Sequence, residues 1–263
     1  MSANRFEASS NTVGNGTPQD FTVYFNNPFP SKNYEIAVEQ ISLSFSWFNI
    51  SAAIGNNLIG YKTVSTGATT TFTIPDGVYG IPDISAFLQL SITTNGDTGA
   101  NITLSPNANT LKTQVNLLNG YCLDLSQGSL WELLGYNSGL VITTQGTTQS
   151  PNEPNVTTVN TVLFHCSAIR SAFYNGKNSD IIAAYSPNAK AGSFITIQPN
   201  HPVYQAVSPD FIENVRFYVT DDQLNILNLN GQPVTYSLIL RPISQTDALL
   251  TKMLTLMEKQ KLN

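Results

Sequence analysis

The chain has 263 residues, with 12 Lys or Arg, 17 Asp or Glu and a formal net charge of −5. Its 10% of aromatic and 41% of hydrophobic residues exclude intrinsic disorder, which needs high charge with few aromatics. No apolar run approaches the ~20 residues of a membrane-spanning helix, so we expect no membrane span. The first residues lack the pattern of a secretory leader, so we expect none. Twelve basic residues scattered along an acidic chain do not form the basic patch of a nucleic-acid-binding protein, so we expect no direct nucleic-acid binding.

The chain is also unusually poor in charge. Charged residues make up 11% of it, against about 25% in an average globular domain. Such a surface is costly for the solubility of a free monomer, whereas the cores of protein interfaces are depleted in charge. The composition therefore fits a protein covered by copies of itself, and it fits a neutral, polar β protein equally well.

The first part of the chain predicts a flexible arm followed by long strands. Residues 1–19 are polar and contain glycine and proline, which is typical of a flexible N-terminal arm. Residues 21–25 alternate as a strand does. Over residues 34–50 the apolar positions change from one face to the other near Glu39 and Gln40, which predicts a β-bulge there.

The middle of the chain mixes strands with two short helices. We predict strands at residues 57–64, 69–74, 101–104 and 110–118. Residues 82–92 carry apolar side chains at helical spacing. Residues 130–134 predict a second short helix, which ends at Gly135 in the usual position of a C-terminal glycine. We expect residues 137–158, rich in Ser, Thr, Gln, Asn and Pro, to form a loop.

The second half returns to short strands separated by turns. These strands are predicted at residues 159–169, 181–185, 194–199, 215–220 and 234–242. Strands dominate overall, so we expect an all-β fold: a single jelly-roll β-sandwich with an α+β insertion. The jelly-roll is assigned to residues 20–65 and 159–243, and the insertion to residues 66–158. A double jelly-roll needs more chain than 263 residues provide.

The C-terminal residues 244–263 predict an amphipathic helix. Ser244 and Asp247 fit a capping box, and an apolar stripe from Leu249 to Met257 follows at helical spacing. The stripe fits a helix that closes the core of the sandwich, and it also fits a helix that docks on a partner subunit.

Few residues are available for metal or nucleophile chemistry. The chain has the cysteines Cys122 and Cys166 and the histidines His165 and His201. His165 and Cys166 are neighbours in a predicted strand, so their side chains point to opposite faces, which makes a four-ligand zinc site a poor fit. We expect two reduced core thiols, although a disulfide fits the count. With no catalytic motif present, we expect no enzyme and no catalytic, metal or cofactor-binding residue.

Four acidic residues and two tryptophans are the other candidates. Asp210, Glu213, Asp221 and Asp222 lie around strand ends and a turn, where solvated acids are normal, so a catalytic pair is the weaker interpretation. Trp47, expected within a strand, and Trp131, on the apolar side of a short helix, would suit a glycan site. Both are explained more simply as core residues.

Three motifs taken together resemble one protein family. The first runs from Pro75 to Ile84 (PDGVYGIPDI), a Gly-x-Tyr turn leading into an amphipathic helix. The second is residues 130–136 (LWELLGY). The third combines residues 215–222 (VRFYVTDD), 227–231 (LNLNG) and 236–241 (YSLILR). In this order they resemble the minor capsid, or penton, proteins of virophages and polinton-type viruses, over roughly residues 20–242.

The resemblance implies a structural role without catalysis. Proteins of that family are single jelly-rolls that form homopentamers at the fivefold vertices of an icosahedral capsid. It implies a double jelly-roll major capsid protein as the partner, and location in the virion, assembled inside the infected host cell. The insertion would project as a vertex knob or pack beside the sandwich. The alternative function is a jelly-roll spike module that binds a receptor or glycan.

Overall fold

The computed structural model describes residues 4–12, 15–170 and 172–243. Its chain divides into two compact units, one made of the segments before residue 47 and after residue 158, and the other spanning Trp47–Thr158. Apart from two helices and a 3-10 turn, the regular elements within these described ranges are strands. The protein is therefore an all-β protein, as the strand pattern predicted.

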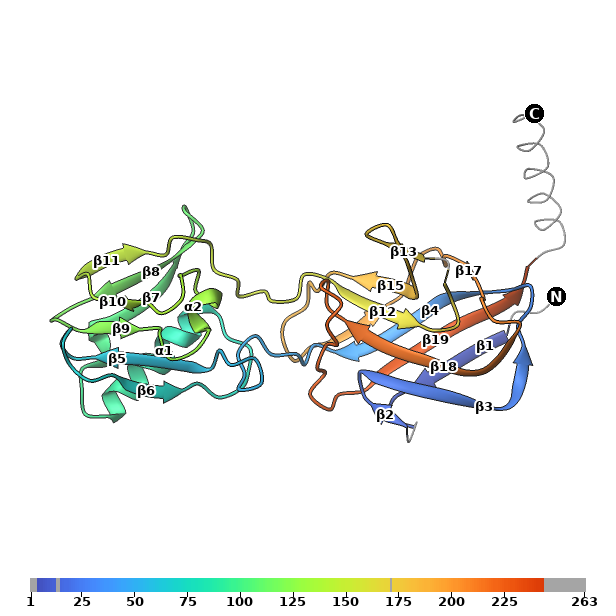
Figure 1. The fold of residues 1–263 in the computed structure, drawn as a ribbon, viewed down its shortest axis with the longest axis horizontal. Helices are drawn as coiled ribbons and strands as arrows, with labels where there is room; N and C mark the ends of the chain where they lie inside the picture. The colour runs from blue at the N-terminus through green and yellow to red at the C-terminus, as the bar shows by residue number, and fades with distance from the viewer. Residues whose placement is uncertain (1–3, 13–14, 171, 244–263) are drawn as a thin grey trace, which may run out of the picture. The chain divides into compact units, whose positions relative to one another are not determined.

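The first unit consists of two antiparallel sheets (Figure 1). One sheet has the order β1 (Asn4–Ser9), β19 (Val234–Pro242), β4 (Tyr34–Ser44) and β16 (Phe194–Ile197), with β17 (Gln205–Ala206) also paired to β4. The other has the order β15 (Ile181–Tyr185), β12 (Val162–Cys166), β18 (Phe211–Thr220), β3 (Asp20–Pro30) and β2 (Gly16–Thr17). A small hairpin of β13 (Ala172–Tyr174) and β14 (Lys177–Ser179) stands apart.

The strand order is that of a jelly-roll. Its eight principal strands, in chain order, are β1, β3, β4, β12, β15, β16, β18 and β19. The first sheet contains the first, eighth, third and sixth of these, and the second contains the second, seventh, fourth and fifth. This double Greek-key arrangement defines the fold. We call residues 4–46 and 159–243 of the described chain the jelly-roll unit.

Residues 47–158 form the insertion unit, between the third and fourth jelly-roll strands. One sheet joins β10 (Val141–Ile142), β9 (Cys122–Asp124), β5 (Leu58–Lys62) and β6 (Thr70–Thr73). A second joins β11 (Gly146–Gln149), β8 (Lys112–Leu117) and β7 (Ile102–Asn107). The helices are α1 (Ile81–Thr94), the 3-10 turn η1 (Gly99–Asn101) and α2 (Leu130–Leu133). Both predicted α-helices are thus present.

Three predicted boundaries were wrong. The insertion begins at Trp47 and not at residue 66, because β5 pairs with β6 and β9 inside the insertion. The N-terminal residues 1–19 are not simply an arm, since residues 4–9 form the edge strand β1. The loop predicted at 137–158 contains β10 and the polar edge strand β11. Polar segments such as these form strands because backbone hydrogen bonds to a neighbouring strand hold them. The alternation of apolar and polar residues along the sequence does not reveal that pairing.

The bulge predicted in the long strand β4 is present. Val38 pairs with Leu238 and Gln40 with Ser237, so Glu39 has no counterpart in β19. The extra residue lets apolar side chains on both sides of it reach the core. The predicted C-terminal helix, residues 244–263, lies outside the described residues.

Candidate functional site

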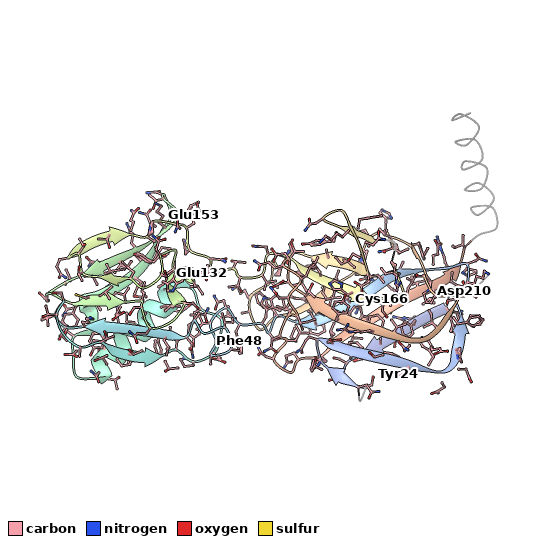
Figure 2. The ribbon with its side chains drawn as sticks, viewed as in Figure 1. Tyr24, Phe48, Glu132, Glu153, Cys166 and Asp210 are labelled. Atoms are coloured by element: carbon pink, nitrogen blue, oxygen red, sulfur yellow. The ribbon has the colours of Figure 1, made fainter. Side chains whose placement is uncertain are left out.

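The candidate site lies on the outer face of the second jelly-roll sheet. Along β12 and β18, alternate side chains point into the sandwich, where Phe164, Cys166 and Phe217 are fully buried; Figure 2 shows Cys166 inside the unit. The intervening residues His165 and Tyr218, which pair across the two strands, therefore point outward. The prediction that His165 and Cys166 face opposite ways is correct.

These outward side chains line a pocket of about 590 Å³. It is formed by β12, β18, the hairpin β13–β14 and the turn after β18. The hydroxyl of Tyr174 in the hairpin donates to the carbonyl of Asp222 in the turn at 2.7 Å, which ties the two walls together. The lining residues are His165, Ser167, Ile169, Arg170, Asn178, Ser179, Asp180, Tyr218, Thr220 and Leu224.

A buried polar network forms the floor of this pocket. His165, only 3% exposed, lies with Nδ1 2.7 Å from the Asp180 carboxylate and Nε2 3.0 Å from the Thr220 hydroxyl. The Tyr218 hydroxyl donates to both oxygens of Asp180 at 3.0 Å. The rings of His165 and Tyr218 stack with centroids 4.1 Å apart. The network thus holds four side chains in fixed positions.

The ionisation of the network follows from these contacts. Burial by itself would raise the pKa of Asp180, but the hydrogen bonds from His165 and Tyr218 and the charge of His165 outweigh it, so the pKa lies below its usual value. Burial, together with the hydrogen bond to Asp180, raises the pKa of Tyr218 to about 12. Asp180 is therefore an ionised acceptor and Tyr218 a protonated donor at neutral pH.

The sequence of carboxylate, imidazole and hydroxyl has the order of a hydrolytic triad. However, Thr220 is 2% exposed, and its hydroxyl also lies 3.0 Å from the carbonyl of Asp221, to which it donates. A nucleophile must reach a substrate carbonyl, and this hydroxyl is enclosed. We therefore interpret the network as structural support for the pocket.

The cysteines and histidines considered above as metal ligands are not brought together. Cys122 is in the insertion unit and Cys166 in the jelly-roll unit, both as buried free thiols. Burial raises the pKa of Cys166 to about 12 and raises that of Cys122 as well, so neither is an activated nucleophile. His201 is exposed. Within the described ranges, no three His, Cys, Asp or Glu side chains group as metal ligands would.

The four acidic candidates are at the surface or cap a turn. Asp210 and Glu213 are exposed, and Asp210 lies 3.9 Å from the Lys32 ammonium. One oxygen of the Asp221 carboxylate accepts the backbone N–H groups of Gln223 and Asn225. Asp222 contributes the carbonyl that Tyr174 binds. They do not form a catalytic pair.

The two tryptophans are buried or partly buried. Trp47 is 5% exposed, although it follows the end of β4 and is not within a strand as expected. Trp131 is partly buried against the core of the insertion unit. Neither forms part of an exposed aromatic platform.

No feature of the sequence marks Asp180, the central residue of the network. It stands immediately before the predicted strand at 181–185, a place where a solvated acid is ordinary. Its partner His165 lies 15 residues earlier in the chain. Only the pairing of β12 with β15 and β18 brings His165, Asp180 and Tyr218 together, and no local signal marks that contact.

In the part of the chain that the structure describes, no helix is both long and apolar enough to cross a membrane. No family model and no curated protein sequence matches the chain. Among solved structures, the chain is similar to the mavirus penton protein, with 10% sequence identity and a TM-score of 0.47, over 92% of this chain and 99% of that one.

Proposed function

We propose that this chain is a structural capsid protein, a penton capsomer that forms homopentamers at the fivefold vertices of an icosahedral virion. Its partner in the shell would be a double jelly-roll major capsid protein. The observation that carries this proposal is that the two flanks of a charge-poor jelly-roll unit each expose an aromatic side chain on an edge strand. The motifs that resemble virophage and polinton-type pentons support it.

The first flank contains β1 and β3. The rings of Phe6 in β1 and Phe25 in β3 stack with centroids 5.3 Å apart, so these edges of the two sheets meet. Tyr24 in β3 is 63% exposed, and Figure 2 shows it at the surface. Within the described residues, β3 pairs on its outer side only with β2, at Asp20 and Phe21. The remaining edge offers unpaired backbone groups to a neighbour.

The second flank contains the opposite edges, β15 and β16. In the described chain, β16 pairs only with β4, and β15 only with β12. Phe194 in β16 is 70% exposed. Each protomer therefore has two different flanks, each with an edge strand and an exposed aromatic side chain. A closed ring of heterologous contacts requires two such different surfaces on every protomer.

The three motifs of the resemblance have definite places in this architecture. The turn at residues 75–80 leads into α1, whose first residue is Ile81. Leu134 is the C-cap of α2, and Gly135 follows with φ +78°. The third motif contains the end of β18, the Asn230–Gly231 turn with both φ positive, and most of β19. Two motifs thus lie in the insertion unit and one in the jelly-roll unit.

The test is the solution mass of the full chain, measured by light scattering. We expect a species near five times 28.6 kDa. It should persist at about 0.5 M salt, because exposed ion pairs are screened there and neutral contacts are not. Replacing either flank residue, in Tyr24→Ser or Phe194→Ser, should shift the mass to the monomer.

The matched control is Leu90→Ser on α1, which removes an equally exposed apolar side chain (68%) from the insertion unit. It should leave the mass unchanged. A monomeric wild-type chain, or flank variants that keep the wild-type mass, would contradict the proposal and favour the spike module.

A further inference from the structure

The outer-face pocket has more hydrogen-bond donors than its own network uses. In the described chain, the side chains of Arg170 and Asn178 have no hydrogen-bond or ion-pair partner. Ser167 Oγ accepts the Arg216 N–H at 2.9 Å and Ser179 Oγ accepts the Ile181 N–H at 3.2 Å. Both hydroxyl hydrogens therefore remain free to donate.

The carboxylate of the pocket, Asp180, is occupied, in contrast. Both oxygens of Asp180 already accept bonds from Tyr218, and one also from His165. The groups left over are one guanidinium, two hydroxyls and one amide. Such a set fits a ligand that supplies one planar anionic group together with several neutral oxygens, because a guanidinium binds a carboxylate in a fork.

One apolar residue of the pocket wall, Leu224, has an unfavourable backbone conformation. Leu224 has φ +68°, a conformation that is unfavourable for a leucine, and it is 51% exposed. The turn is fixed by Asp221, whose carboxylate holds Gln223 and Asn225. Because Leu224 lines the pocket and is half exposed, its side chain leaves apolar surface in the pocket wall for a bound group to contact.

We propose that this pocket binds an acidic sugar, a saccharide that carries a carboxylate. Arg170 would pair with the carboxylate, while Ser167, Ser179 and Asn178 would bind ring hydroxyls. The C–H face of the ring would pack on Leu224 and Ile169. A volume of about 590 Å³ is within the usual range of small-ligand sites, about 300–1,000 Å³. The site is independent of the flanks that form the proposed pentamer.

The experiment is calorimetric titration of the full-length chain with three probes. Glucuronate contains all the groups that the pocket selects, glucose lacks the carboxylate, and acetate lacks the ring. We expect saturable binding of glucuronate and at least about tenfold weaker binding of glucose and acetate, the loss expected when charge-assisted or multiple hydrogen bonds are removed. Absent glucuronate binding would overturn the proposal. Acetate binding as tight as glucuronate binding would overturn it as well and indicate a simple carboxylate site.

Two pairs of variants locate the binding. Arg170→Gln should weaken glucuronate binding about tenfold or more, whereas Lys177→Gln, which removes a charge outside the pocket lining, should leave it unchanged. Leu224→Asn should raise thermal stability, since Asn tolerates positive φ, and weaken binding at least about threefold by removing an apolar contact. Its control is Leu111→Asn, at φ +55° in the insertion unit. This variant should raise thermal stability and leave glucuronate binding unchanged.

Binding that is unchanged in Arg170→Gln or in Leu224→Asn would reject the assignment to this pocket. The solution mass of Arg170→Gln, measured in parallel, should match the wild type. Sugar binding and pentamer formation can therefore fail separately.

Discussion

The two units of this chain both enclose mostly aliphatic cores, and they differ in what packs across the core: a second sheet in the jelly-roll unit, and a helix in addition to sheets in the insertion unit. Between the jelly-roll sheets, four rings among the aliphatic side chains contact one another, with Phe21 against Phe217 at 5.6 Å, Phe217 against Tyr236 at 4.7 Å and Phe164 against Tyr236 at 6.1 Å. The buried cluster of the insertion unit is mostly Ile, Leu and Val, and α1 contributes Ile84, Leu88 and Ile92 to it.

The difference in arrangement follows from the layers that each unit packs. Two sheets lie about 10 Å apart, and rings from both inner faces can meet across that gap. A helix on a sheet instead presents a stripe of apolar side chains, here the aliphatic residues of α1. Each unit thereby has a core of its own, and we infer that the two unfold separately. Substitutions confined to one core test that separation.

The largest expected effect is the loss of an aromatic ring from the jelly-roll core. Phe217→Ala should destabilise its unit by about 4 kcal/mol, which lowers the transition temperature by about 10 °C. The insertion transition should stay in place in differential scanning calorimetry. Ile84→Ala should lower the transition temperature of the insertion unit and leave that of the jelly-roll unit in place. If either variant moved both transitions together, the units would not unfold separately.

A second prediction concerns Gly135, at the end of α2. A Cβ at this position would lie 2.4 Å from the carbonyl oxygen of Asn152, and the residue has φ +78°. Gly135→Ala should therefore cost about 3 kcal/mol, from left-handed strain plus a backbone clash. Gly139→Ala is the control, since it has φ +68° with nothing within 4 Å, and it should cost about 1 kcal/mol. Urea unfolding of the insertion transition measures both, and equal costs would refute the clash.

The polar network should make the jelly-roll unit sensitive to acid. Because the pKa of Asp180 is lowered in the folded chain, its stabilisation is present above the unfolded value of about 3.9 and is lost as pH falls below it. Asp180→Asn should cost about 2 kcal/mol at pH 6, and this difference from wild type should shrink towards pH 2.5. Urea titrations at several pH values measure it.

Asp210→Asn, at an exposed position, should follow the wild-type acid profile. A deficit of Asp180→Asn that stays constant with pH would show that the carboxylate contributes through packing and not through its charge.

The smallest expected effect has opposite signs in the two units. The Tyr236 hydroxyl is buried in the jelly-roll core and has no hydrogen-bond partner among the residues that the structure describes, so Tyr236→Phe should stabilise the chain by about 1 kcal/mol. In the insertion unit, the Tyr61 hydroxyl donates to Asp97 at 2.5 Å and accepts from Asn95 at 2.8 Å. Tyr61→Phe should cost about 1 kcal/mol. Thermal unfolding of both variants measures these changes in stability. Unfolding temperatures that shift in the same direction would contradict the comparison.

Elements with strong local periodicity were predictable from the sequence. The helix at 82–92 and the bulge near Glu39 are both present, because apolar spacing reports directly which face of an element is buried. The strand β1 was not predictable, since residues 4–9 are mostly polar and only Phe6 and Ala8 mark an inner face. Its pairing with β19, more than 200 residues away, holds it in the sheet.

The sequence by itself determined that this is a β-rich protein with two short helices, few charges and no local motif for catalysis. These properties reside in composition and in the spacing of neighbouring residues. Only the tertiary structure decided where the insertion begins, which strands form the flanks, and that His165, Asp180 and Tyr218 meet beneath a pocket. Those features depend on antiparallel pairing between distant strands, and the partner of a strand is chosen by the whole sheet, so no local pattern encodes it.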